Sequence, residues 1–185
     1  REELRELEEL DLSGRSFWDK IRDQYFLYVC SGVSIGDFKN LLAVVNPTTN
    51  SFSFRCEKTG EISVIPAFDA IKRICEKYNY HFPKLVHETI VLREIKKICK
   101  LIPSMNIPVE KKYTKQGVTV REHKMKYEMI HIHTARRTLV TLMADAGLPY
   151  HQIMKITGHK KLTTLQKYIK SKADIDQMLE VGNGL

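Results

Sequence analysis

The last third of the chain is a series of short helical segments separated by glycines, and this pattern limits the possible folds most strongly. Apolar residues recur at helical spacing over 134–146, before Gly147, and over 149–157, before Gly158. Glycine ends helices because it adopts the left-handed conformation at low cost. Further helices are expected at about 163–171 and 174–180.

The rest of the chain mixes predicted helices with alternating, β-prone segments. Helical spacing predicts helices at about 2–11, 17–30, 37–42, 67–78 and 87–101. Alternation over 51–56 and 61–65 predicts an antiparallel hairpin with Lys58 at its tip. A polar segment over 110–130 predicts a second hairpin or a long loop. The predicted fold is therefore mostly α with a small antiparallel β-sheet (α+β), as one domain over residues 1–185.

The charge of the chain favours a polyanionic partner. The sequence has 30 Lys and Arg against 22 Asp and Glu, a net charge of +8, and residues 110–172 alone hold fourteen basic and four acidic side chains. This excess coincides with the histidine and arginine motifs described below, so we expect phosphate contacts there. The basic residues expected to bind DNA are Arg137, Lys160, Lys161 and Lys167.

Other sequence features define the expected setting. No apolar run approaches the roughly 20 residues that span a bilayer, so no membrane association is expected. The four cysteines are scattered without a C-x-x-C pair, which predicts buried thiols in a reducing compartment. The chain begins at Arg1 without signal-peptide character, and we expect a fragment of a longer intracellular protein.

Six residues near the C-terminus stand in an order that indicates phosphodiester chemistry: His133, Arg136, Gly158, His159, Thr164 and Tyr168. Cleaving DNA without a metal requires a nucleophile, positive charge at the phosphate, a base, and an acid for the leaving 5′ oxygen. Tyr168 is the candidate nucleophile, because a phosphotyrosine would conserve the bond energy for rejoining.

The remaining roles have candidates as well. Arg136 offers a planar fork that can hold two phosphate oxygens. His133 lies three residues earlier, on the same helix face, and could take the tyrosine proton. His159 could donate a hydrogen bond to a phosphate oxygen, and Gly158 lets the chain turn so that this ring points inward. Lys58, at the hairpin tip, could protonate the leaving oxygen.

Each of these residues also has a structural interpretation. A tyrosine is usually amphipathic core or surface, a lone histidine is usually a satisfied structural residue, and a K-T-G turn can be simply a soluble hairpin tip. A zinc site of His123, His131 and His133 would lack a completing cysteine or carboxylate, so neither a metal nor another cofactor is expected.

Several motifs together resemble the signature of the tyrosine recombinase, or phage integrase, family. These motifs are His133-Thr134-Ala135-Arg136-Arg137-Thr138, Thr157-Gly158-His159 and Leu162-Thr163-Thr164-Leu165-Gln166-Lys167-Tyr168. Further upstream, 57–60 is similar to the β-hairpin lysine motif of the family, and 31–38 is similar to its T-G-L-R-x-x-E/D-L box. The opening and the stretch 126–128 look most like integrases of conjugative transposons and related mobile elements.

The resemblance implies a fold, an activity and partners. The chain would be a catalytic domain, without the N-terminal DNA-binding domains, that forms a 3′-phosphotyrosine and integrates or excises a mobile element. Tyr168, Arg136, His133, His159 and Lys58 would be its catalytic residues. Its partners would be double-stranded DNA, further copies in a synaptic tetramer, and accessory excision or host DNA-bending factors. It would act in the bacterial cytoplasm, at the nucleoid.

Ser34 departs from the family pattern, because it occupies the position of the first catalytic arginine. Losing one charged phosphate ligand should cost about 10²–10³ in rate unless another group compensates. Ser34 could be a substitution that traps a complex, Arg55 on the hairpin could supply the charge, or the protein could be a catalytically silent DNA-binding relative. Asp37, in the same box, would support the site or be an ordinary helix N-terminal carboxylate. A type IB topoisomerase-like enzyme is a further alternative.

Overall fold

A computed structural model of the chain describes residues 2–45, 49–166 and 169. The α-helices are α1 (Glu2–Glu9), α2 (Ser16–Ser31), α3 (Ile35–Val44), α4 (Asp69–Lys77), α5 (Glu88–Cys99), α6 (Ile132–Asp145), α7 (Tyr150–Thr157) and α8 (Leu162–Gln166). The strands are β1 (Ser51–Arg55), β2 (Ile62–Pro66), β3 (Pro108–Lys115) and β4 (Val118–Met125), and two 3₁₀ turns are η1 (Pro103–Met105) and η2 (Lys126–Met129). The fold is mostly α, as predicted.

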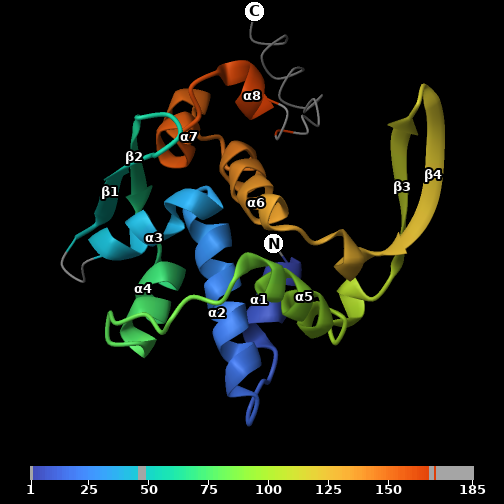
Figure 1. Ribbon diagram of the computed structural model, residues 1–185, viewed down its shortest axis with the longest axis horizontal. Helices are drawn as coiled ribbons and strands as arrows, with labels where there is room; N and C mark the ends of the chain where they lie inside the picture. Colours follow the sequence, from blue (N-terminus) through green and yellow to red (C-terminus); the bar gives the residue numbers. More distant parts are fainter. Residues whose placement is uncertain (1, 46–48, 167–168, 170–185) are drawn as a thin grey trace, which may run out of the picture.

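Helix α2 lies at the centre of the fold, and α4, α5 and α6 pack against it (Figure 1). Large apolar side chains from all four helices are fully buried where they meet: Ile21, Ile71, Ile95, Ile98 and Val140. Each such side chain contributes about 1.5–3 kcal/mol to folding by leaving water. This core supports α6, which carries the H-x-x-R motif.

The predicted small sheet is two separate two-stranded sheets in the described part of the chain. In the first, Phe52 and Phe54 of β1 alternate inward, and Ser63 and Ile65 of β2 do the same. The buried Ser63 hydroxyl donates to the carbonyl of Ile156 in α7, at 2.6 Å. The β1–β2 hairpin is therefore joined directly to the helix that precedes His159.

Gly158 ends a helix in the left-handed conformation, as predicted, and Gly32 ends α2 in the same conformation. Gly32 follows α2 with φ 60°, and a Cβ there would lie 2.6 Å from Leu139 Cδ2. Gly158 follows α7 with φ 69°, and a Cβ there would lie 2.8 Å from Cys56 Sγ. Any other residue type would be strained by this backbone conformation and would have to push a neighbouring side chain aside.

Some predicted boundaries differ from the structure. Helix α8 ends at Gln166, and Ile169 is not helical, although helix was predicted to about 171. The segment 110–130 is a hairpin rather than a loop, formed by β3 and β4. The helix predicted at 174–180 lies outside the described residues.

Cys56, Cys75 and Cys99 are buried thiols, and Cys30 is half-buried. None of the described helices combines the length and the apolar character that crossing a membrane requires.

Candidate active site

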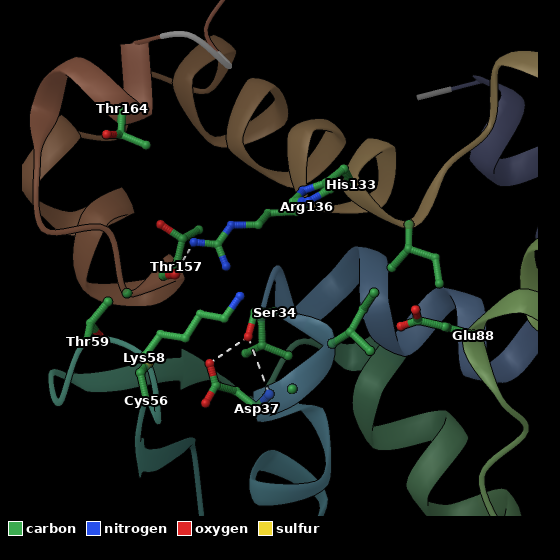
Figure 2. A pocket seen from close by; sticks show the side chains of 15 residues that line it. Ser34, Asp37, Cys56, Lys58, Thr59, Glu88, His133, Arg136, Thr157 and Thr164 are labelled. Carbon is green, nitrogen blue, oxygen red and sulfur yellow. Dashed lines mark hydrogen bonds between the residues drawn. The ribbon is translucent and has the colours of Figure 1, made fainter.

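A cavity of about 780 Å³ brings together three of the predicted catalytic side chains, Lys58, His133 and Arg136. Ser34 and Asp37 also line it. Figure 2 shows that these residues come from the start of α3, the β1–β2 turn and α6, which are far apart in the sequence. The fold therefore brings together three of the five side chains that the motifs predicted to be catalytic.

Arg136 projects from α6 towards the end of α7. Its Nη2 donates to the carbonyl oxygen of Thr157 at 2.5 Å and lies 3.3 Å from both ring nitrogens of His159. Figure 2 shows the guanidinium beside Thr157, inside the cavity. This geometry places a fixed positive charge where a phosphate could enter.

His159 does not line this cavity, but its ring lies against Arg136 and Thr157. Nδ1 is 2.6 Å from Thr157 Oγ1, and that hydroxyl donates to the Ile153 carbonyl at 2.7 Å. Because a hydroxyl has a single proton, we assign Thr157 Oγ1 as the acceptor from Nδ1–H. Nε2 then carries the lone pair of a neutral ring.

The charge state of His159 agrees with this tautomer. Burial, together with the adjacent Arg136 guanidinium, lowers the pKa of His159 to about 4. At neutral pH the ring is therefore uncharged, and its one N–H is directed at Thr157. Donation to a phosphate, as predicted from the sequence, would require the ring to turn or to change tautomer.

Ser34 is the N-cap of α3. Its hydroxyl donates to Asp37 Oδ2 at 2.6 Å, and its oxygen accepts the Asp37 amide N–H at 3.3 Å. Asp37 is only 5% exposed, and its Oδ1 accepts the amide N–H of Glu57 at 2.8 Å. The carboxylate thus links the start of α3, where it lies in the first turn, to the turn that carries Lys58.

Lys58 and Arg55 differ in position although both belong to the first hairpin. Figure 2 shows the Lys58 side chain extending from the turn into the cavity, towards Ser34 and Arg136. Arg55 is exposed at the end of β1, donates to the Gly60 carbonyl at 2.6 Å, and is not among the residues that line the cavity. The structure brings Lys58 to the Ser34 position and leaves Arg55 outside.

The other predicted residues surround this site. Thr164 of α8 lines the cavity. Arg137 and Lys161 are exposed, and Lys160 forms an exposed ion pair with Glu61 at 3.8 Å. The predicted nucleophile Tyr168 and the predicted DNA-binding Lys167 lie outside the described residues.

Sequence reasoning assigned no role to Thr157, Cys56 or Glu88. Thr157 orients His159, and its place directly before Gly158-His159 is the only sequence signal for it. Cys56 lies under Gly158, and burial raises the pKa of its thiol, so it is a packing residue. Glu88 lines the cavity from the start of α5, and no sequence pattern indicates this. In the described ranges, no group of three or more His, Cys, Asp or Glu could hold a metal ion.

Comparison with known proteins identifies the class. The model of the Phage integrase family matches residues 56–174, which include Lys58, the H-x-x-R motif and Gly158-His159. The chain therefore belongs to the phage integrase family of tyrosine recombinases, as its motifs predicted. No curated protein has a significantly similar sequence.

Solved structures of tyrosine recombinases share the fold. The XerA recombinase has a TM-score of 0.63 and 17% identity, over 98% of this chain and 62% of that one. The Tn1549 transposon integrase with circular intermediate DNA has a TM-score of 0.58 and 12% identity, over 100% of this chain and 64% of that one. XerH bound to palindromic difH substrate has a TM-score of 0.62 and 12% identity, over 98% of this chain and 50% of that one. The chain thus spans less than two thirds of each of these proteins.

Proposed function

We propose that this chain is the catalytic domain of a site-specific DNA recombinase that integrates or excises a mobile element. The observation that carries this proposal is the meeting of Lys58, His133 and Arg136 in one cavity. Thr164, four residues before Tyr168, lines the same cavity, so the chain leads from the site directly to the proposed nucleophile.

In the proposed reaction, the Tyr168 oxygen attacks the scissile phosphorus and forms a 3′-phosphotyrosine while the bond to the 5′ oxygen breaks. His133 takes the phenolic proton, and Lys58 gives a proton to the leaving 5′ oxygen. Arg136 stabilises the negative charge of the transition state. His159, after its ring turns or changes tautomer, donates a hydrogen bond to a phosphate oxygen. Attack by the 5′ hydroxyl of a partner strand reverses these steps, so the reaction needs no external energy source.

The substrate of the proposed enzyme is double-stranded DNA. Tn1549 integrase and XerH, which share the fold, were both solved bound to DNA. Arg137, Lys160, Lys161 and Lys167 would contact its phosphates, which position a protein without selecting bases. Copies of the chain would assemble into a tetramer on DNA in the bacterial cytoplasm, with accessory excision or host DNA-bending factors as further partners.

A suicide substrate tests the proposal. The chain is incubated with duplex DNA that carries a nick just 3′ of the cleavage site, so that the short fragment bearing the new 5′ hydroxyl diffuses away after cleavage. We expect an SDS-resistant protein–DNA adduct that Tyr168→Phe abolishes. Absence of any adduct, with DNA binding intact, would overturn the enzyme proposal.

Ser34 specifically favours a second candidate, a catalytically silent DNA-binding relative. The Ser34 side chain caps α3 instead of offering a positive charge to a phosphate. The same assay separates the two candidates, because a silent relative binds the DNA and leaves no adduct.

A further inference from the structure

The β3–β4 hairpin extends away from the helical body, on the side opposite β1 and β2 (Figure 1). Its base is held by two hydrogen bonds, from Lys126 N–H to the Ile107 carbonyl at 2.9 Å and from Met125 N–H to Glu128 Oε2 at 3.0 Å. η2 connects this base directly to α6. The two strands pack mainly on each other, and β4 also contacts η2.

The two faces of this hairpin differ in how their charges are paired. On one face, Lys111 lies opposite Glu122, whose carboxylate is 3.5 Å from Lys111 Nζ and 3.3 Å from Lys124 Nζ. These three side chains are half-buried. We call this the paired face, because its positive charges are already partly neutralised.

The opposite face carries, beyond the Pro108–Met125 pair at the base, three cross-strand pairs that are called here the open face. These pairs are Glu110 with His123, Lys112 with Arg121, and Thr114 with Thr119, and all six residues are exposed. Lys112 and Arg121 are directly opposite in register, so their side chains leave the sheet side by side. Within the described ranges, neither forms an ion pair or a side-chain hydrogen bond.

Two like charges directly opposite on a hairpin destabilise it. Glu110 lies on the same face, but within the described ranges it forms no ion pair with either cation, whereas an anion held between the two side chains would offset the repulsion directly. A phosphate fits this position, because Arg offers a fork of N–H donors and Lys a compact charge. The neighbouring Thr114 and Thr119 hydroxyls are further donors of the kind that bind phosphate oxygens.

We propose that the open face binds the backbone of duplex DNA, with Lys112 and Arg121 holding one phosphate between them. This inference rests on the proposed function, since it adds a DNA contact to the same enzyme. Lys112 and Arg121 lie four residues along the strands from the Pro108–Met125 pair at the base, so the contact stands roughly 13 Å out along the hairpin.

The salt dependence of DNA binding tests this contact. Fluorescence anisotropy with a labelled mixed-sequence duplex, at 50–200 mM salt, compares the chain with K112Q/R121Q and with the matched control K111Q/K124Q. Both variants lose two positive charges from the same hairpin, but only the first loses the open-face pair. We expect K112Q/R121Q to bind more weakly and to flatten the slope of log K against log salt by about 1, the value for one lost phosphate contact, and the control to change it by less than half as much.

The outcomes separate this inference from the proposed function. Equal slope changes in both variants would show a diffuse charge effect and overturn the open-face contact, as would an unchanged slope in K112Q/R121Q. Failure of the unsubstituted chain to bind the duplex would overturn the proposed function itself. Thermal unfolding of both variants checks the fold, which exposed substitutions on a projecting hairpin should leave intact.

Discussion

The carboxylate of Asp37 accepts a hydrogen bond from the backbone amide of Glu57, at 2.8 Å, and so holds the residue before Lys58 against the start of α3. The lysine that enters the cavity is therefore positioned by a buried side chain from a separate element.

Asp37→Ala should slow strand cleavage by weakening the position of Lys58. A positioned general acid contributes about 10²–10⁴ to a rate, so we expect a loss of about 10² in adduct formation. The control is a substrate with sulfur in place of the 5′ bridging oxygen, because a thiolate leaves without a proton. This substrate should restore most of the rate. Equal defects on both substrates would show that Asp37 does not act through Lys58.

Ser34→Arg should change rate and stability in opposite directions. The guanidinium would add a second phosphate ligand and raise adduct formation by up to about 10²–10³. The loss of the α3 N-cap should lower the free energy of unfolding by about 1 kcal/mol. Ser34→Ala loses the same cap and gains no charge, so urea unfolding should show a similar loss without any increase in rate. If Ser34→Arg leaves the rate of adduct formation unchanged, the positive charges of Lys58 and Arg136 are enough to stabilise the phosphate in the transition state.

Stability should fall at mildly acidic pH because of His159. Burial and Arg136 lower the pKa of His159 from 6.5 to about 4, so the unfolded chain takes up a proton before the folded one does. This contribution to the free energy of unfolding is fully present above pH 6.5 and is lost as the pH falls towards 4. Urea unfolding across this range should show a shallower pH dependence for His159→Gln than for the unsubstituted chain. Exposed His151→Gln is the matched control and should retain the full dependence.

Gly158→Ala should destabilise the junction between α7 and His159 in two separable ways. Left-handed backbone costs a non-glycine residue roughly 1–2 kcal/mol, and the new Cβ would also lie 2.8 Å from Cys56 Sγ. Introducing Gly158→Ala into a Cys56→Ala background should relieve the clash and leave the backbone cost. A double-mutant cycle of unfolding free energies measures the difference. Strict additivity would mean that Cys56 moves aside at no cost.

Local periodicity predicted most of the fold, because helices and hairpins are set by neighbouring residues. The alternation of side chains along β1 also explains why Arg55 does not reach the cavity. Phe52 and Phe54 point inward, so Arg55 shares the exposed face of β1 with Ser51 and Ser53. A cation at this position therefore points away from the cavity. Lys58 lies in the turn, where strand alternation does not fix the direction of the side chain, and it enters the cavity.

The candidate site was predicted from motif order rather than from physical pattern, and its finer contacts were not predicted. Ser34 was interpreted as a lost charge, although a serine three residues before an acidic residue is also a helix N-cap pattern. The tautomer of His159 depends on Thr157 and on Arg136, which is 23 residues away in sequence. No local pattern reports such a tertiary contact.

The Ser63–Ile156 hydrogen bond bears on when the candidate site forms during synthesis. It joins residues 93 apart and packs α7 on β2, the strand that follows the turn with Lys58. Closing such long loops comes late in folding, because their entropy is lost before contacts compensate for it. A nascent chain in which α7 has not yet left the ribosome therefore lacks this link, and the candidate site is completed only late in folding.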